Sequence, residues 1–130
     1  MATIKTYTDI EQSKKLAEFL PIESADMFYW CADHYPKEDW IIEVGELDDN
    51  YECICAWSLA ALLGVLPVMI DYKGSIIRLR MDKGNVGQDD YAIWYDDLDN
   101  GLSTNIASEA KNFIDACYEM IIKLHEQNIL

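Results

Sequence analysis

The centre of the chain reads Ser58-Leu59-Ala60-Ala61-Leu62-Leu63-Gly64-Val65-Leu66-Pro67 and contains no charged side chain. Ser58 can act as an N-cap because its hydroxyl accepts a hydrogen bond from a free backbone N–H, and Pro67 cannot continue a helix. These signals predict a helix over residues 59–66. Because this helix is apolar on every side, we expect it either to be buried or to be covered by a partner.

A hairpin is predicted before the central helix. Residues 27–31 and 40–44 are rich in the aromatic and β-branched side chains that strands favour. Pro36 marks the turn that separates them. Residues 46–52 contain four acids and are expected to form a loop between the hairpin and the helix.

A second hairpin is predicted after the central helix. Residues 75–81 alternate apolar and basic side chains in their second part, which indicates a half-exposed strand, and residues 91–95 return as its partner. Residues 82–90 form the polar turn between them. Residues 68–72 are either a lead-in strand or an extended connector.

Two further helices flank these elements. Thr8 and Glu11 have the spacing of a capping box for a helix over residues 9–20, which Pro21 ends. A longer helix is predicted over residues 107–127. Its apolar face consists of residues at helical spacing, namely Ala110, Phe113, Cys117, Met120, Ile121 and Leu124.

The order of these elements predicts an α+β fold. At this length we expect residues 1–130 to form a single domain. The expected order is α-β-β-α-β-β-α, with one antiparallel sheet of about four strands and the helices packed on one face of it.

The charge of the chain limits the classes of partner. The sequence contains 24 acids and 10 bases, which gives a formal net charge of −14. Direct binding of nucleic acid or of an anionic membrane is disfavoured, because phosphates are bound by clustered Lys and Arg, whereas a basic protein surface would be attracted. The uncharged run at residues 53–70 reaches the length of a membrane span, but Gly and Pro interrupt it and acids flank both ends. We therefore expect a cytoplasmic protein.

No motif in the sequence identifies a reaction. The sequence lacks the nucleophile elbow, the glycine-rich phosphate loop and the zinc-protease helix, and we expect no cofactor. Cys53 and Cys55 with His34 or His125 lack the paired spacing of a structural zinc site, so reduced core thiols are expected. The acidic run at residues 96–101 fails the pattern of a calcium loop. An unrecognised hydrolase or metal-dependent enzyme is the alternative to a binding protein.

Three blocks of the sequence carry a family resemblance. They are residues 7–21 (YTDIEQSKKLAEFLP), residues 56–67 (AWSLAALLGVLP) and residues 119–128 (EMIIKLHEQN). Together they resemble a family of small acidic proteins carried by phages and mobile elements of gut bacteria. That family has no assigned activity, so the resemblance implies a genomic setting and no site residues.

Two groups of residues are candidates for contact with a partner protein. Acids gather at the expected loop tips: Asp48, Asp49, Asp89, Asp90, Asp96, Asp97 and Asp99. Carboxylates in such groups can imitate a phosphate backbone, which makes a DNA-mimicking inhibitor a special case of protein binding. Tyr29 and Tyr95 are the expected outward anchors if Trp30 and Trp94 beside them face the core. We expect the protein to act by binding a host or phage protein with a basic surface.

Overall fold

The computed structural model describes residues 4–31, 40–45, 52–84, 90–97 and 101–130. In chain order its elements are α1 (Ile10–Ala17), η1 (Ile22–Ser24), β1 (Met27–Cys31), β2 (Ile41–Val44), β3 (Glu52–Ala56), α2 (Leu59–Val65), β4 (Met69–Tyr72), β5 (Ser75–Lys83), β6 (Tyr91–Asp97), β7 (Leu102–Ala110) and α3 (Phe113–Glu126).

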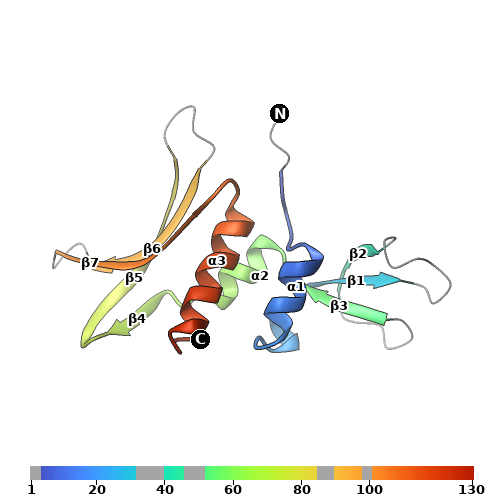
Figure 1. Ribbon diagram of the computed structural model, residues 1–130, viewed down its shortest axis with the longest axis horizontal. Helices are drawn as coiled ribbons and strands as arrows, with labels where there is room; N and C mark the ends of the chain where they lie inside the picture. Colours follow the sequence, from blue (N-terminus) through green and yellow to red (C-terminus); the bar gives the residue numbers. More distant parts are fainter. Residues whose placement is uncertain (1–3, 32–39, 46–51, 85–89, 98–100) are drawn as a thin grey trace.

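The strands form two antiparallel sheets with the helices between them (Figure 1). The three-stranded sheet has the order β2-β1-β3, and the four-stranded sheet has the order β4-β5-β6-β7. α1 contacts β3, α3 packs on β6 and β7, and α2 contacts α3. Each sheet therefore meets the helical layer on one side.

The predicted α+β class is confirmed, but the expectation of a single sheet is wrong. Both predicted hairpins form, since β1 pairs with β2 and β5 pairs with β6. They do not join edge to edge, because each takes other strands as neighbours. β3, which was not predicted and of which only Glu52 was expected in the acidic loop, pairs with β1 on the side away from β2. β4 and β7 flank the second hairpin.

The boundary before α3 lies later in the chain than predicted. Residues 107–110, expected in the helix, belong to β7 and pair with β6. Asn112 has an extended backbone, and its side-chain oxygen accepts a hydrogen bond from the N–H of Asp115 at 2.8 Å. This N-cap explains why the helix begins at Phe113.

The start of α1 is capped by a different residue from the one predicted. Asp9 is the N-cap and forms a reciprocal capping box with Gln12. The hydroxyl oxygen of Thr8 instead accepts a hydrogen bond from the backbone N–H of Trp57 at 3.1 Å. Thr8 thereby ties the entry to α1 to the segment between β3 and α2.

The uncharged run at residues 53–70 is divided among three elements, β3, α2 and β4. Its helical part, α2, has 7 residues. Within the described ranges of the chain, no helix combines the length and the apolar character needed to cross a membrane.

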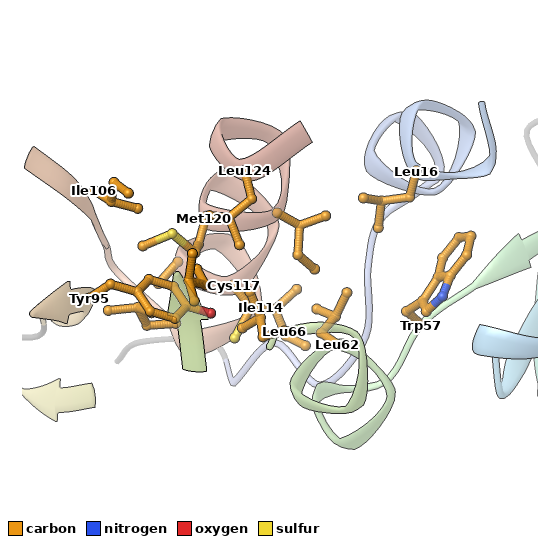
Figure 2. Close-up of a cluster of buried hydrophobic side chains, with 14 of the residues drawn as sticks. Leu16, Trp57, Leu62, Leu66, Tyr95, Ile106, Ile114, Cys117, Met120 and Leu124 are labelled. Atoms are coloured by element: carbon orange, nitrogen blue, oxygen red, sulfur yellow. The ribbon is translucent and has the colours of Figure 1, made fainter. Parts of the chain in front are cut away.

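The core lies between the four-stranded sheet and the helices (Figure 2). Its fully buried side chains include Leu62, Ile77, Ile93, Tyr95, Ile106, Ile114, Cys117, Met120, Ile121 and Leu124. Leu16 and Trp57, also fully buried, belong to the same cluster. They extend the cluster to α1 and to the end of β3, so apolar packing links the two sheets through the helical layer.

Candidate functional site

The two tyrosines expected to face outward are buried. Tyr29 is 8% exposed and Tyr95 is fully buried. The Tyr29 hydroxyl donates to the backbone oxygen of Thr8 at 2.7 Å, and the Tyr95 hydroxyl donates to that of Pro67 at 2.6 Å. Burial is the main cause that raises the pKa of Tyr29 to about 12, so this hydroxyl stays protonated as a donor. The expected outward orientation is therefore wrong.

Tyr95→Phe should lower the free energy of unfolding by about 1 kcal/mol, because it removes a buried donor from the Pro67 carbonyl. Urea unfolding measures the difference. Tyr118→Phe, at a half-buried position of α3, is the matched control and should change stability by less than about 0.5 kcal/mol. If Tyr95→Phe instead weakened partner binding at unchanged stability, Tyr95 would be an interface residue after all.

The predicted acidic groups do not form one cluster among the described residues. Asp48, Asp49, Asp89 and Asp99 lie outside those residues, and Asp90, Asp96 and Asp97 lie within them. The Asp90 carboxylate pairs with Lys111 at 2.9 Å, just before β6 begins. Asp97 is the last residue of β6, so these two acids lie at opposite ends of one strand.

Asp96 is enclosed on the face of the four-stranded sheet that lies away from the core. Trp94 Nε1 donates to Asp96 Oδ2 at 2.6 Å, and Arg80 Nε donates to Asp96 Oδ1 at 3.1 Å. Asp96 is only 4% exposed as a result. Its carboxylate fixes the Trp94 and Arg80 side chains and is not displayed to a partner.

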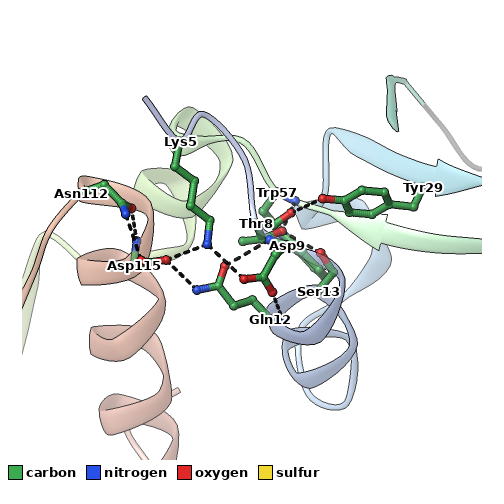
Figure 3. Close-up of polar contacts among 9 residues, drawn as sticks. All are labelled: Lys5, Thr8, Asp9, Gln12, Ser13, Tyr29, Trp57, Asn112 and Asp115. Atoms are coloured by element: carbon green, nitrogen blue, oxygen red, sulfur yellow. Dashed lines mark hydrogen bonds and ion pairs between the residues drawn. The ribbon is translucent and has the colours of Figure 1, made fainter. Parts of the chain in front are cut away.

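A polar network joins the N-terminal ends of α1 and α3 (Figure 3). Lys5 Nζ lies 2.8 Å from Asp115 Oδ1 and 3.1 Å from Asp9 Oδ2. Gln12 Nε2 and Asn112 Nδ2 donate to the Asp115 carboxylate at 2.8 Å and 2.9 Å. The network borders a hollow of about 410 Å³. No sequence pattern predicted that these segments would meet.

The charges in this network are fixed rather than poised for proton transfer. Burial alone would raise the pKa of the Asp115 carboxyl, but hydrogen bonds from Lys5, Gln12 and Asn112 outweigh burial and lower it below 3.8. Burial would likewise lower the pKa of Lys5, but its bonds to Asp115 and Asp9 raise it above 10.5. The pair joins the segment before α1 to α3. Both groups are ionised at neutral pH, so they are poorly suited to general acid–base work.

The side chains weighed as zinc ligands do not come together in the part of the chain that the structure describes. Cys53 and Cys55 lie on β3, His125 lies in the last turn of α3, and His34 is outside the described residues. Burial raises the pKa of Cys55, and it raises that of Cys117 to about 12, so both stay thiols. Among the described residues, no three His, Cys, Asp or Glu side chains gather as they would around a metal ion.

An apolar groove of about 450 Å³ lies where α2 meets the C-terminal ends of α1 and α3. Its lining residues, which define the α2 groove, are Leu20, Pro21, Ser24, Ala61, Gly64, Val65 and Leu130. Figure 1 shows the C-terminal ends of α1 and α3 at the same end of the helical layer, with α2 between them.

Two chain turns build the walls of the α2 groove. Pro21 is the N-cap of η1 and redirects the chain after α1. Asn128 has a φ of 59°, a left-handed conformation that asparagine tolerates at a helix end. The chain then folds back, so that the N–H groups of Ile129 and Leu130 reach the backbone oxygen of Leu124 at 2.8 Å and 3.3 Å. This return places Leu130 in the groove.

The predicted apolar helix forms one wall of the α2 groove. The helix over residues 59–66 is confirmed as α2, and the Ser58 hydroxyl caps it by accepting from the Ala61 N–H. Leu62 is its one fully buried residue, while Ala60 and Gly64 are exposed. The all-apolar sequence of α2 was the one feature of the sequence that pointed to this groove. The other wall of the groove could not be predicted, because it is formed by segments distant in sequence from α2.

No protein-family model, curated protein or solved structure matches the chain. Function is therefore inferred from the residues of this chain alone. The resemblance of three sequence blocks to small acidic proteins of phages and mobile elements stays a prediction.

Proposed function

We propose that this chain is a small cytoplasmic accessory protein of a phage or mobile element that acts by binding a host or phage protein with a basic surface. Its role in this proposal is recognition, without a reaction of its own. The setting in a phage or mobile element rests on the sequence resemblance of residues 7–21, 56–67 and 119–128. The observation that carries the binding role is the α2 groove, an open apolar surface on a protein of strongly negative charge.

The surface charge supports a basic partner. Exposed acids occur on α1, η1 and α3, among them Glu11, Glu23, Glu119 and Glu126. With a net charge of −14, the field of the protein attracts a basic surface from a distance and repels a second acidic one. Such complementarity accelerates association and selects the partner, while apolar contacts supply much of the affinity.

The ionisable groups with shifted pKa values support recognition over proton transfer. Burial raises the pKa values of Tyr29 and Cys117 to about 12, away from neutrality. The pKa of Lys5 is raised and the pKa of Asp115 is lowered, so both side chains stay charged at neutral pH. A general acid or base works best with a pKa near the operating pH, and these shifts lead away from it.

Salt dependence tests the electrostatic part of the proposal. The tagged full chain is used to capture a partner from bacterial lysate, and the dissociation constant is then measured with the purified partner. We expect binding to weaken about tenfold or more between about 0.05 M and 0.5 M NaCl, because salt screens exposed charges. The same affinity at both concentrations, or failure to recover any specific partner, contradicts the proposal. If duplex DNA competes for the partner, the protein is a DNA mimic.

A further inference from the structure

α2 keeps an apolar side that the rest of the described chain does not bury. Its sequence, Leu59-Ala60-Ala61-Leu62-Leu63-Gly64-Val65, has no polar side chain. A helix that is apolar all round is expected to be covered on every side. Here only Leu62 is fully buried, and Ala60 and Gly64 are exposed.

The α2 groove has the size and lining of a site for apolar anchors. Its volume of about 450 Å³ falls in the range of ligand pockets, roughly 300–1,000 Å³. Leu20 and Pro21 form one side, and Ala61, Gly64 and Val65 form the other. The small Ala61 and Gly64 let another backbone approach α2 closely, as in helix-in-groove recognition.

Exposed apolar side chains follow two of the segments that line the groove. Ile22, next to the groove residue Pro21, is 65% exposed, and Val68, just after α2, is 71% exposed. Met69 beside it is 55% exposed. Exposed apolar side chains close in sequence to an apolar groove add to the surface available to a partner protein.

The charge near the groove selects the kind of occupant. Glu23 is exposed between Ile22 and the groove residue Ser24, and Glu126 is exposed on the last turn of α3, before Leu130. Glu18, at the end of α1, is paired with Lys15 at 3.2 Å. Acids at this position repel a fatty-acid carboxylate or an anionic lipid, and the net charge of −14 opposes a second copy of the chain.

We propose that the α2 groove docks an amphipathic helix of the partner protein, with that helix's apolar side chains in the groove and its Lys or Arg side chains beside Glu23. This inference rests on the proposed protein-binding function and names the site and the chemistry of the partner. Apolar residues spaced at i, i+3 or i+4, and i+7 of the partner helix are the anchors.

Filling the groove tests the site. A Cβ added at Gly64 has no atom of another segment within 4 Å, and tyrosine is a better helix former than glycine. We expect Gly64→Tyr to keep or raise the thermal stability and to weaken binding of the captured partner by about tenfold or more. Asn105→Tyr, at an exposed position of β7, is the matched control and should bind like the wild type.

Charge reversal tests the chemistry of the partner without filling the groove. Glu23→Lys should weaken binding about threefold or more and flatten its dependence on salt. Glu109→Lys makes the same charge change at an exposed position of β7 and should have a smaller effect on both quantities. Equal effects of the two substitutions would show that only the overall charge matters and would overturn the proposed position of the basic side chains.

A displayed library of random peptides of about 15 residues, roughly four helical turns, identifies the preferred occupant. We expect the full chain to select amphipathic sequences rich in Lys or Arg, and we expect Gly64→Tyr not to bind them. Selected peptides that bind Gly64→Tyr equally well would overturn the proposal that the α2 groove is the docking site. Self-association of the wild type that Gly64→Tyr abolishes would also overturn the proposal, because a second copy would then occupy the groove.

The two proposals can fail separately. If a captured partner binds Gly64→Tyr as tightly as the wild type, the α2 groove is not the docking site, but the proposed protein-binding function stands. If no partner is captured but basic amphipathic peptides bind in the groove, the site stands and the proposed cellular role is wrong.

Discussion

Replacing Trp57 with alanine is expected to lower the free energy of unfolding by about 3–5 kcal/mol. Trp57 is fully buried and belongs, with Leu16, to the part of the core cluster that reaches α1 (Figure 2). Its indole N–H donates to Ser24 Oγ at 2.9 Å, so the substitution removes a hydrogen bond as well as a large apolar volume. The small residue leaves a cavity between α1, α2 and the end of β3.

Trp57→Phe separates the two contributions. Phenylalanine retains most of the apolar volume and lacks the N–H, so we expect a loss of about 1–2 kcal/mol. Urea unfolding of the three proteins gives the comparison. If the alanine variant lost less than about 1 kcal/mol, Trp57 would not be packed in the core as the structure places it.

Asp115→Ala is expected to lower the free energy of unfolding by about 2 kcal/mol at neutral pH, because hydrogen bonds to a charged group are the stronger ones. The substitution leaves Lys5, Gln12 and Asn112 without their shared acceptor. Asp115 is 34% exposed, so water can replace part of these contacts, and the expected loss is smaller than for a buried ion pair.

The pH dependence of stability tests the same network. The pKa of Asp115 is lower in the folded protein than its ordinary value of 3.8. Its contribution is therefore complete above about pH 4 and is lost as the pH falls through the folded pKa. The wild type and Asp115→Asn should differ in unfolding free energy at about pH 6 and converge towards about pH 2. If the difference in unfolding free energy stayed constant over this range, the contribution of Asp115 to stability would not depend on its charge.

Local sequence patterns predicted most of the elements, but tertiary pairing decided their limits. Residues 107–110 contain good helix formers, and they fold as part of β7 because β6 offers them a pairing edge. Their alternation leaves Ala107 and Glu109 exposed and Ser108 buried, which is a strand pattern. β3 was missed because its residues 53–56 run without a polar break towards the apolar helix α2, so the sequence does not mark where a strand ends.

The candidate site could not be predicted from the spacing of residues along the sequence. Alternation along β6 requires Trp94 and Tyr95 to face opposite ways, but only the position of α3 decides that Tyr95 faces the core. The α2 groove combines segments near residues 20, 64 and 130, which no local pattern relates. The apolar sequence of α2 did predict that a partner could cover this helix, which is the property used in the proposal.

The division of the strands into two sheets creates additional free edges. Within the described ranges, β2, β3, β4 and β7 each have a strand neighbour on one side only, which leaves sheet edges open to pairing with other chains. At neutral pH, mutual repulsion between chains of charge −14 opposes such edge-to-edge stacking. Near the isoelectric point of about 4.2 this repulsion vanishes, so colloidal stability is lowest in mildly acidic solution.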